Sequence, residues 1–464
     1  MDSEAQPSRG GPVLAERVAA DEAGYTRPFV RDPGRALNIG LLGMGVVGTG
    51  LIQALHAKTA LLQPRVGCPV RVKSVLVRDL DKPRGFQVAR GLLTTRPEDV
   101  LNDPEVDIVV EVMGGEHPAL EYILAAIEVG KHVVTANKEV VARHGREILA
   151  RAHHHGVQVR FEASVAGGVP IVAPLLRDLA ANEITSIRGI VNGTTNYILS
   201  RMAQQGLECG EALAEAQRLG YAEADPAKDV GGMDAACKLS ILCALVFGVW
   251  TKDLEMHRQG INGLARRDLE CARELGYAVK LMASAKKVGG VVYSGVYPAF
   301  VPEGSAIAQV DGVLNAVEVE TDLAGPLLFT GQGAGPSPTA SALIADIMDV
   351  ALGTKLSTKA MRGALHGEAA KVGRMADLEA EHYLRLVVAD RPQRLTEVRR
   401  RLSDHGVESS FAMFRELPQS DSKVEVVVMT RRAKLASVQQ ALSAMQKAGA
   451  VLEVGNVCRV EEAR

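Results

Sequence analysis

A loop rich in carboxylates leads into an apolar helix that carries a lysine. The acids of segment 219–238 are Glu223, Asp225, Asp229 and Asp234. Asp234 and Lys238 are four residues apart, so their side chains share one face of a helix. Because Lys238 runs directly into the apolar stretch 239–250, we expect it to be partly buried, and such a lysine is suited to proton transfer. The alternative is a surface ion pair, which would contribute little to stability.

A glycine-rich turn near the start of the chain has the spacing of a dinucleotide-binding loop. Residues 43–48 read G-M-G-V-V-G, between an apolar run and a helical pattern. Glycines let the backbone turn tightly and approach a pyrophosphate, whose charge then lies at the helix N-terminus. The predicted cofactor-binding residues of this turn are Gly43, Gly45, Val46, Val47 and Gly48. A glycine-rich turn of an unrelated α/β fold is the alternative.

Three further residues are candidates for cofactor contacts. Arg78 is the first polar residue after the second apolar run, where a cation suits a 2′-phosphate and favours NADP over NAD, unless it is a solvated surface arginine. Lys138 follows the fourth expected strand at its carboxyl edge and could contact substrate or cofactor. Gly333 belongs to a second glycine-rich loop, 331–339, which either packs on the cofactor or is a bare turn.

Two other segments could bind a cation. The turn 162–170 follows an acidic strand end and contains two adjacent glycines, and its carbonyl oxygens would suit a hard cation, although the sequence alone favours an interdomain hinge. The run His153-His154-His155 lies at a helix end without a cysteine or histidine at ligand spacing. We interpret it as a solvated face.

The elements that position these residues alternate between strand and helix. Apolar runs predict buried strands over 37–42, 70–78, 106–113, 132–135 and 157–162. Helical patterns lie between them at 46–60, 118–129 and 138–155. The middle of the chain predicts helices at 170–181, 194–204, 210–219, 233–248, 268–285 and 337–352, with strands near 291–297 and 313–320. The fold class is therefore α/β, with a Rossmann-type parallel sheet and an α+β substrate domain.

Composition shifts divide the chain into five parts. We expect a mobile tail over 1–36, a dinucleotide-binding domain over 37–165 with a return segment at 331–355, a substrate-binding domain over 166–366, and a linker over 367–381. Residues 382–464 follow a β-α-β-β-α-β order, which predicts a ferredoxin-like module. Because the catalytic motifs all precede residue 341 and this module can bury its own core, few catalytic contacts should cross the linker, and the catalytic part should fold without it.

Composition also excludes several classes of protein. The 53 Lys and Arg against 55 Asp and Glu give a formal net charge of -2, and 8 Phe, 8 Tyr and 1 Trp offer few stacking platforms, so a nucleic-acid binder is not expected. The 6 cysteines form no C-x-x-C pair, which indicates reduced thiols. The apolar stretch 241–250 is too short to span a membrane, and 1–36 lacks a signal-peptide core, so we expect a cytoplasmic protein.

At the level of motifs the sequence resembles the homoserine dehydrogenase family. The resemblance lies in the 43–48 turn and in TANKEV (135–140), FEASVAGGVP (161–170), GIVNGTTNYIL (189–199), LGYAEADPAKDVGGMDAACK (219–238) and GQGAGPSPTA (331–340). The 382–464 module resembles a regulatory ACT domain. No aspartate kinase fits in residues 1–36, so we expect the monofunctional form.

The resemblance implies a reaction and roles for the candidate residues. The family interconverts L-homoserine and L-aspartate 4-semialdehyde with NAD(P), on the route to threonine, methionine and isoleucine. By motif, Lys238 would be the proton-transfer residue, Glu223 the homoserine-binding carboxylate, and Asp229, Asp234 and Lys138 further residues of the substrate pocket. The backbone carbonyls of Glu162, Val165, Gly167 and Val169 would be the ligands of a sodium ion, which raises the cation interpretation above the hinge.

The resemblance also implies partners. We expect a homo-oligomer, a dimer or tetramer, and an amino-acid effector such as threonine at the turn 390–395 of the ACT module. Gln393 stands where the usual pattern has glycine, which puts effector binding there in question. The competing hypotheses are another NADP-dependent amino-acid semialdehyde reductase and a non-catalytic NADP-sensing regulator. Turnover of homoserine with NADP would discriminate between them.

Overall fold

The N-terminal part of the chain is built on an all-parallel six-stranded sheet. The computed structural model describes residues 35–251, 256–354, 370–390, 392–416 and 422–462, so almost all of the expected tail lies outside the described residues. The strand order is β3-β2-β1-β4-β5-β6. The strands are β1 (Leu37–Leu42), β2 (Val70–Leu76), β3 (Leu93–Thr94), β4 (Ile108–Glu111), β5 (His132–Thr135) and β6 (Val159–Arg160). This order confirms the predicted Rossmann-type sheet.

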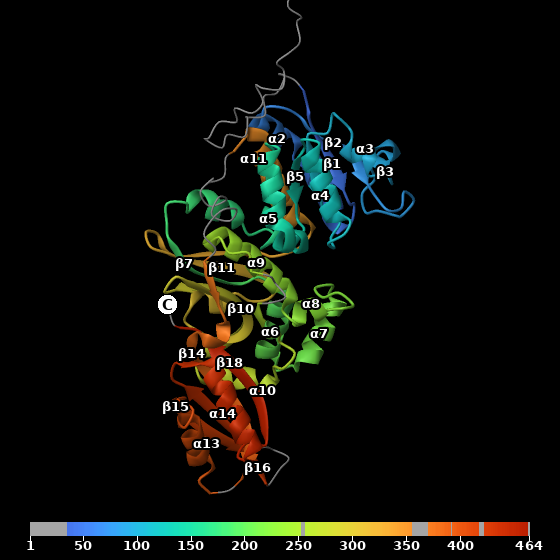
Figure 1. The fold of residues 1–464 in the computed structure, drawn as a ribbon. Coiled ribbons are helices and arrows are strands. Elements are labelled where there is room, and N and C mark those ends of the chain that lie inside the picture. Colours follow the sequence, from blue (N-terminus) through green and yellow to red (C-terminus); the bar gives the residue numbers. More distant parts are fainter. Residues whose placement is uncertain (1–34, 252–255, 355–369, 391, 417–421, 463–464) are drawn as a thin grey trace, which may run out of the picture.

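Helices cover both faces of this sheet, and one of them comes from late in the chain (Figure 1). They are α1 (Val46–Ala57), α2 (Thr59–Val66), α3 (Glu98–Leu101), α4 (Ala119–Glu128), α5 (Lys138–His154) and α11 (Pro336–Leu352). The return helix α11 packs closely on α1 at Gly50. A side chain at this position would clash, since a Cβ added there would lie 2.9 Å from Cβ of Pro336. This packing brings the loop before α11 to the same end of the sheet as the 43–48 turn.

The middle of the chain forms a mixed sheet with helices against one face. Its strands run in the order β12-β11-β7-β9-β10. Their bounds are β7 (Ile184–Ile190), β9 (Tyr277–Val288), β10 (Val291–Pro302), β11 (Leu314–Thr321) and β12 (Gly325–Gln332), and the short strands β8 (His257–Arg258) and β13 (Lys371–Gly373) pair with β10. The helices are α6 (Gly193–Gln205), α7 (Cys209–Arg218), α8 (Ala227–Val230), α9 (Met233–Phe247) and α10 (Arg266–Glu274).

The helix predicted over 268–285 is wrong in its second half. Helix α10 ends at Glu274, and Gly276 takes a left-handed φ of 82° that stops it. The chain continues as β9, whose residues 279–285 are all buried and which pairs with β7 and β10 at its two edges. A strand buried on both faces has a continuous apolar run, which its sequence alone does not distinguish from a buried helix. The helix predicted over 170–181 is likewise shorter, with a single π-helical turn at Pro174–Asp178.

The C-terminal module has the predicted β-α-β-β-α-β order. Its elements are β14 (Glu379–Ala389), α13 (Arg394–Ser403), β15 (Ser409–Glu416), β16 (Lys423–Thr430), α14 (Leu435–Lys447) and β18 (Glu453–Val460), with a short β17 (Ala433–Lys434). The strands lie in the order β18-β14-β16-β15, which is ferredoxin-like. Part of the expected linker is structured, since 371–373 form β13 against β10.

The module is joined to the middle sheet through its last strand. Strand β18 pairs with β10 in parallel, with Ala299 opposite Arg459 and Phe300 opposite Val460, so the two sheets are continuous. The buried carboxylate of Asp268 in α10 accepts hydrogen bonds from Tyr383 (3.1 Å) and Nε of Arg385 (2.6 Å) in the module. The module and the middle sheet are therefore joined by main-chain and buried polar contacts, although the module also buries a core of its own, as predicted.

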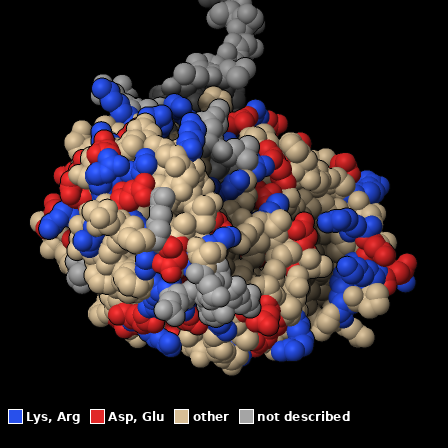
Figure 2. Space-filling view, turned by 90° about the horizontal axis from the view of Figure 1, so that it is seen from below, with Lys and Arg blue, Asp and Glu red and all other residues tan. Residues whose placement is uncertain are grey.

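Charged side chains are mixed in sign over the surface. Figure 2 shows Lys and Arg interspersed with Asp and Glu on the face seen from the module end, without a large area of one sign. This distribution agrees with the formal net charge of -2. In the described part of the chain no helix is both long and apolar enough to cross a membrane.

Candidate active site

The glycine turn has the geometry that a dinucleotide requires. Gly43 follows β1 directly with a φ of 102°, and its N–H donates to O of Leu76 at the end of β2 (3.0 Å). A Cβ at Gly48 would lie 2.2 Å from O of Gly43, so this position must be glycine for α1 to start where it does. No heavy atom lies within 4 Å of a Cβ built at Gly45, which leaves open space at the N-terminus of α1. A phosphate fits such a site.

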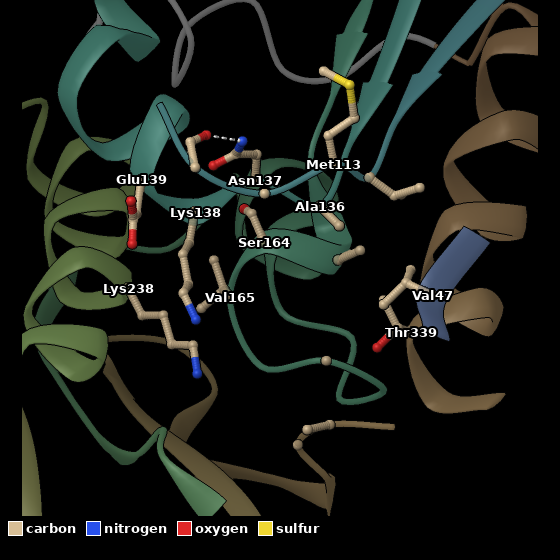
Figure 3. Close-up of a pocket in the computed structure, with 17 residues that line it drawn as sticks. Val47, Met113, Ala136, Asn137, Lys138, Glu139, Ser164, Val165, Lys238 and Thr339 are labelled. Carbon is tan, nitrogen blue, oxygen red and sulfur yellow. Dashed lines mark hydrogen bonds between the residues drawn. The ribbon is translucent and has the colours of Figure 1, made fainter. Parts of the chain in front are cut away.

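A cavity of about 310 Å³ opens beside this turn, between the parallel sheet and the middle of the chain (Figure 3). It is lined from both parts of the molecule, by residues that include Val47, Lys138, Ser164, Lys238, Gly333 and Thr339. It lies at the carboxyl ends of β4 and β5, the edge at which open α/β sheets bind their ligands. The predicted turn, lysines and second glycine loop therefore meet at one cavity.

Two lysines from different elements converge on one buried carboxylate. In Figure 3 the side chains of Lys138, from the start of α5, and Lys238, from α9, extend to the same place. Nζ of Lys238 lies 2.7 Å from Oδ2 of Asp234, and Nζ of Lys138 contacts Oδ1 of the same carboxylate. Lys238 also donates to O of Val191 at 2.7 Å. The helical spacing of Asp234 and Lys238 thus gives the predicted contact.

The environment drives the pKa values of the two lysines apart. Burial, with the nearby charge of Lys138, lowers the pKa of Lys238 despite the opposing effect of Asp234. Burial opposes the charge of Lys138 as well, but Asp234 outweighs it and raises the pKa of Lys138. Burial also disfavours the Asp234 carboxylate, yet the two lysines hold its pKa well below the usual range. Lys238 is therefore the member of this cluster suited to exchange a proton, and Lys138 stays a cation.

Asn192 connects the second carboxylate of the loop to this cluster. Its Nδ2 donates to Oδ1 of Asp229 (2.8 Å) and to Oδ2 of Asp234 (2.9 Å). Its Oδ1 accepts from the backbone N–H of Thr195 (2.8 Å), which caps α6. Burial and the charge of Asp234 raise the pKa of Asp229. The sequence analysis missed Asn192, although its place before a helical pattern marks it as an N-cap.

Two predicted residues lie away from the lysine cluster. Glu223 is exposed, and its backbone oxygen accepts from Gln217 (3.1 Å). Arg78 is exposed after the end of β2, the strand whose Leu76 holds the glycine turn. Gly333 has a steric reason to be glycine, because a Cβ there would lie 2.1 Å from Cγ of Asn315.

The 162–170 turn is held by its own acidic side chain. The carboxylate of Glu162 accepts from the backbone N–H groups of Ile171 (2.6 Å), Val172 (2.9 Å) and Ala173 (2.7 Å). Val165 and Gly167 line the cavity, whereas Val169 is buried. With its carboxylate engaged, the turn can offer a cation its backbone carbonyls, which are the donor type predicted for it.

Comparisons with known proteins converge on one family. Residues 43–162 match the family model "Homoserine dehydrogenase, NAD binding domain", and residues 170–348 match "Homoserine dehydrogenase". The homoserine dehydrogenase of Synechocystis is 40% identical over 437 residues, covering 91% of this chain and 99% of that protein. That of Bacillus subtilis is 37% identical over 429 residues, covering 92% and 99%.

Solved structures show the same likeness. A homoserine dehydrogenase from Thiobacillus denitrificans has a TM-score of 0.86 at 40% identity, covering 93% of this chain and all of that one (100%). A hyperthermophilic archaeal homoserine dehydrogenase in complex with NADPH has a TM-score of 0.59 at 26% identity, covering 70% of this chain and 100% of that one.

Proposed function

This chain belongs to the homoserine dehydrogenase family, and we propose that Lys238 is the base with which it performs that family's reaction. The enzyme interconverts L-homoserine and L-aspartate 4-semialdehyde with hydride transfer to or from a nicotinamide dinucleotide, in amino-acid biosynthesis. The observation that carries the proposal is the cavity in which Lys238 meets Lys138 and Asp234 beside the glycine turn.

Lys238 handles the proton of the reaction. The bound nicotinamide supplies the hydride acceptor. In homoserine oxidation, the neutral amine of Lys238 takes the hydroxyl proton as the carbonyl forms, and in the reverse direction its ammonium returns a proton to the aldehyde oxygen. The burial that lowers the pKa of Lys238 makes the neutral amine more accessible. Lys138 remains charged and stabilises negative charge that develops on the substrate oxygen.

The acidic groups orient the substrate through its ammonium group. Asp229 is half-buried and lies at the end of the Asn192 bridge, which supports it as a ligand for a cationic amino group near the lysines. Asp234 holds both lysines and so fixes their position relative to the substrate. Glu223 is the further carboxylate that we propose for the amino group, from the exposed part of the same loop.

We propose NADP as the preferred cofactor, with NAD as the alternative. The open space at Gly45 and the N-terminus of α1 take the pyrophosphate, with Gly43, Val46, Val47 and Gly48 forming the turn. Arg78 supports the preference. It is exposed just after β2, the strand whose Leu76 bonds the glycine turn, and its guanidinium suits a 2′-phosphate. Gly333 borders the cavity from the second glycine loop.

We also propose that a monovalent cation, sodium, stabilises the turn at 162–170. The backbone carbonyls of Glu162, Val165, Gly167 and Val169 are the proposed ligands. Support comes from the Glu162 carboxylate, which holds the turn through three N–H bonds and so fixes the backbone without itself serving as a ligand. The cation would position the cavity wall and take no part in the chemical step.

The test of the function is turnover measured with a matched variant. Purified protein is given NADP or NAD with L-homoserine, L-serine or another amino alcohol, and absorbance of the reduced nicotinamide is followed. We expect reduction with L-homoserine, loss of it in Lys238→Met, and no change in Lys447→Met, which alters an exposed lysine on α14. Preference for a different amino alcohol would point to the semialdehyde-reductase alternative. Nucleotide binding without turnover of any substrate would point to the NADP-sensing regulator.

A further inference from the structure

A buried acidic side chain lies at the base of one wall of the active-site cavity. Glu111 is the last residue of β4 and is fully buried, and it does not itself line the cavity. The wall consists of two short segments, 112–115 after β4 and 136–138 after β5, and every residue of both segments lines the cavity. The proposed function gives Glu111 no role, so its presence at this place needs an explanation.

This wall joins the glycine turn to the lysine pair. At one end, a Cβ added at Gly43 would lie 3.1 Å from O of Val112 and 3.1 Å from Cγ of Met113. At the other end, the side chain of Lys138 extends toward Lys238 (Figure 3), and its Nζ contacts the carboxylate of Asp234. The place of Lys138 relative to the glycine turn therefore depends on how the two segments are held.

The segment after β4 needs support because it contains two adjacent glycines. Gly114 and Gly115 take left-handed φ values of 74° and 75°, and glycine backbone has many other conformations available. No heavy atom lies within 4 Å of a Cβ built at Gly114, so packing does not fix the turn there. Hydrogen bonds hold it instead. The N–H of Met113 donates to Oε1 of Glu111 (2.8 Å), and Nδ2 of Asn137 donates to O of Gly115 (2.7 Å), the bond marked in Figure 3.

The same carboxyl group holds the segment after β5. Oε2 of Glu111 accepts from the hydroxyl of Thr135 (2.7 Å), and that hydroxyl oxygen accepts from the N–H of Asn137 (2.9 Å). Oδ1 of Asn137 accepts from the N–H of Val140 (3.2 Å) and so caps α5, which begins at Lys138. A chain of hydrogen bonds thus runs from Glu111 to the residue directly before Lys138.

A carboxyl group at this position is costly for the fold. Strand β4 is buried along its whole length between β1 and β5, where an apolar side chain would suit the core better. Burial raises the pKa of Glu111, and the bonds from Thr135 and Met113 oppose this rise. Among the described residues, no lysine or arginine forms an ion pair with it. Its presence is therefore better explained by the segments that it holds than by a gain in stability.

We propose that Glu111 is a positioning residue of the reaction, whose carboxyl group sets the place of Lys138 relative to the glycine turn by holding both segments of the wall. This inference rests on the proposed function and adds a residue to it. Misplacement of a reacting group by about 1 Å can lower a rate by about 10²-fold. The glycine turn is held separately, by O of Leu76, so loss of Glu111 should impair the chemical step more than cofactor binding.

Steady-state kinetics and fluorescence titration on the full-length protein test the proposal. Glu111→Met has a similar length without the two acceptor oxygens. It should lower kcat for homoserine oxidation about tenfold or more, and change Kd for NADP by less than about threefold. Glu111→Gln keeps an acceptor oxygen and should retain more of kcat. Thr135→Val breaks the link to Asn137 alone and should lower kcat in the same way, whereas Thr135→Ser, which keeps the hydroxyl, should retain more of it.

A double-mutant cycle shows whether Glu111 acts through Lys138. In a Lys138→Met background, Glu111→Met should lower kcat by less than about twofold further, because the group that it positions is already gone. The matched control is Asp107→Asn. Asp107 is a buried carboxylate just before the other end of β4, and it accepts from the backbone N–H of Asn38 (2.8 Å). Its substitution should lower Tm and leave kcat as it is.

Two results would overturn the role of Glu111 while the proposed function stands. Losses that add in the double variant would show that Glu111 does not act through Lys138. A Glu111→Met protein with a lower Tm and an unchanged kcat would make Glu111 a structural residue only. Absence of homoserine turnover in the unaltered protein would instead refute the proposed function, and the role of Glu111 with it.

Discussion

At the scale of single residues, the proposed active site brings two lysines to one carboxylate and shifts their pKa values in opposite directions. Asp234 contacts both, yet the pKa of Lys238 falls and that of Lys138 rises. The difference arises from burial, because Lys238 lies within α9 among apolar side chains while the side chain of Lys138 is 39% exposed. This difference is what the proposed roles require, with Lys238 as the base and Lys138 as the lasting cation.

Replacement of Lys238 by alanine should lower kcat for homoserine oxidation by about 10²- to 10⁴-fold, because it removes the proton acceptor. The affinity for NADP, measured by fluorescence titration, should stay near that of the unaltered protein, since Lys238 is proposed to act in the transition state. Turnover at the original rate would exclude Lys238 from the mechanism.

The pH dependence follows from the same residue. A base must be neutral to act, so homoserine oxidation should rise with pH as Lys238 loses its proton. Because burial lowers the pKa of Lys238 from the ordinary 10.5, the rise should level off below that value. Initial rates measured between pH 7 and 11 at saturating substrate check this. A rate that falls as pH rises over this range would contradict a lysine base.

Asn192 both caps α6 and bridges Asp229 and Asp234, and two substitutions distinguish these roles. In Asn192→Ala both the α6 cap and the bridge between Asp229 and Asp234 are lost, with about 1 kcal/mol of stability for the cap. Asn192→Ser keeps a capping oxygen but is too short to bridge the carboxylates. We expect both variants to lose kcat/KM about tenfold or more, since a hydrogen bond to a charged group contributes about 1.5–3 kcal/mol. Both variants should lower Tm, and the alanine variant should lower it further, because only it also loses the cap.

Arg78→Ala should weaken NADP more than NAD. Only NADP carries the phosphate that a guanidinium binds through two parallel hydrogen bonds. KM for each cofactor, measured with L-homoserine at saturation, gives the comparison. Lys82→Ala, which changes an exposed cation on the same segment after β2, is the control and should affect both cofactors equally. Equal losses in Arg78→Ala would show that it does not contact the 2′ position.

At the scale of elements, the sequence predicted best those strands, helices and contacts that follow from local burial and spacing. The parallel strands, the module order and the contact between Asp234 and Lys238 were all predicted, because burial and helical spacing are local properties. Strand β9 was not predicted, since a strand buried on both faces lacks a period of two. The Asn192 bridge was missed because it joins α6 to the acidic loop, which only the tertiary fold brings together.

The backbone of Gln393, at the start of α13, is in a strained conformation, and a substitution there can test the cost of that strain. It is the N-cap of α13 and takes a φ of 64°, the only positive φ found for a non-glycine residue in the described ranges. Gln393→Gly should relieve this strain and stabilise the protein by about 0.5–1 kcal/mol after the entropic cost of glycine. Gln440→Gly, at an exposed position inside α14, should instead destabilise it by about 1 kcal/mol. Thermal unfolding of both variants measures the opposite signs.

At the scale of the whole molecule, the module and the middle of the chain share one continuous sheet. The module buries a core of its own, and Tyr383, Met429 and Val460 also belong to the core of the middle part. Strand β18 pairs with β10 on one side and with β14 on the other. Tyr383 of β14 stacks on Phe300 of β10 with ring centroids 4.3 Å apart. Strand β10 also meets the start of α9, the helix that carries Lys238, since a Cβ at Gly232 would lie 3.2 Å from Cγ1 of Val296.

The buried pair of Asp268 and Arg385 tests how strongly the two parts depend on each other. Arg385 donates to Asp268 through Nε (2.6 Å) and NH2 (3.2 Å), and Asp268 is fully buried. Arg385→Met should lower stability by about 3–5 kcal/mol, because it leaves a buried charge without its partner. The double variant Asp268→Asn/Arg385→Met should recover much of the loss, as judged by chemical denaturation. Equal losses in both would mean that the charge is not the cause.

Removal of the module should therefore also destabilise the remaining part of the chain. Deletion of residues 379–464 uncovers the β10 edge and the apolar surface around Phe300, which is fully buried against Tyr383 in the intact chain. An exposed apolar strand edge pairs with other chains, so we expect the truncated protein to aggregate or to unfold at a lower temperature. Size-exclusion chromatography and thermal unfolding against the full chain measure this. A truncated protein that stays monodisperse and oxidises homoserine at the full rate would show that the shared sheet is dispensable, and that the module folds as a separate unit after all.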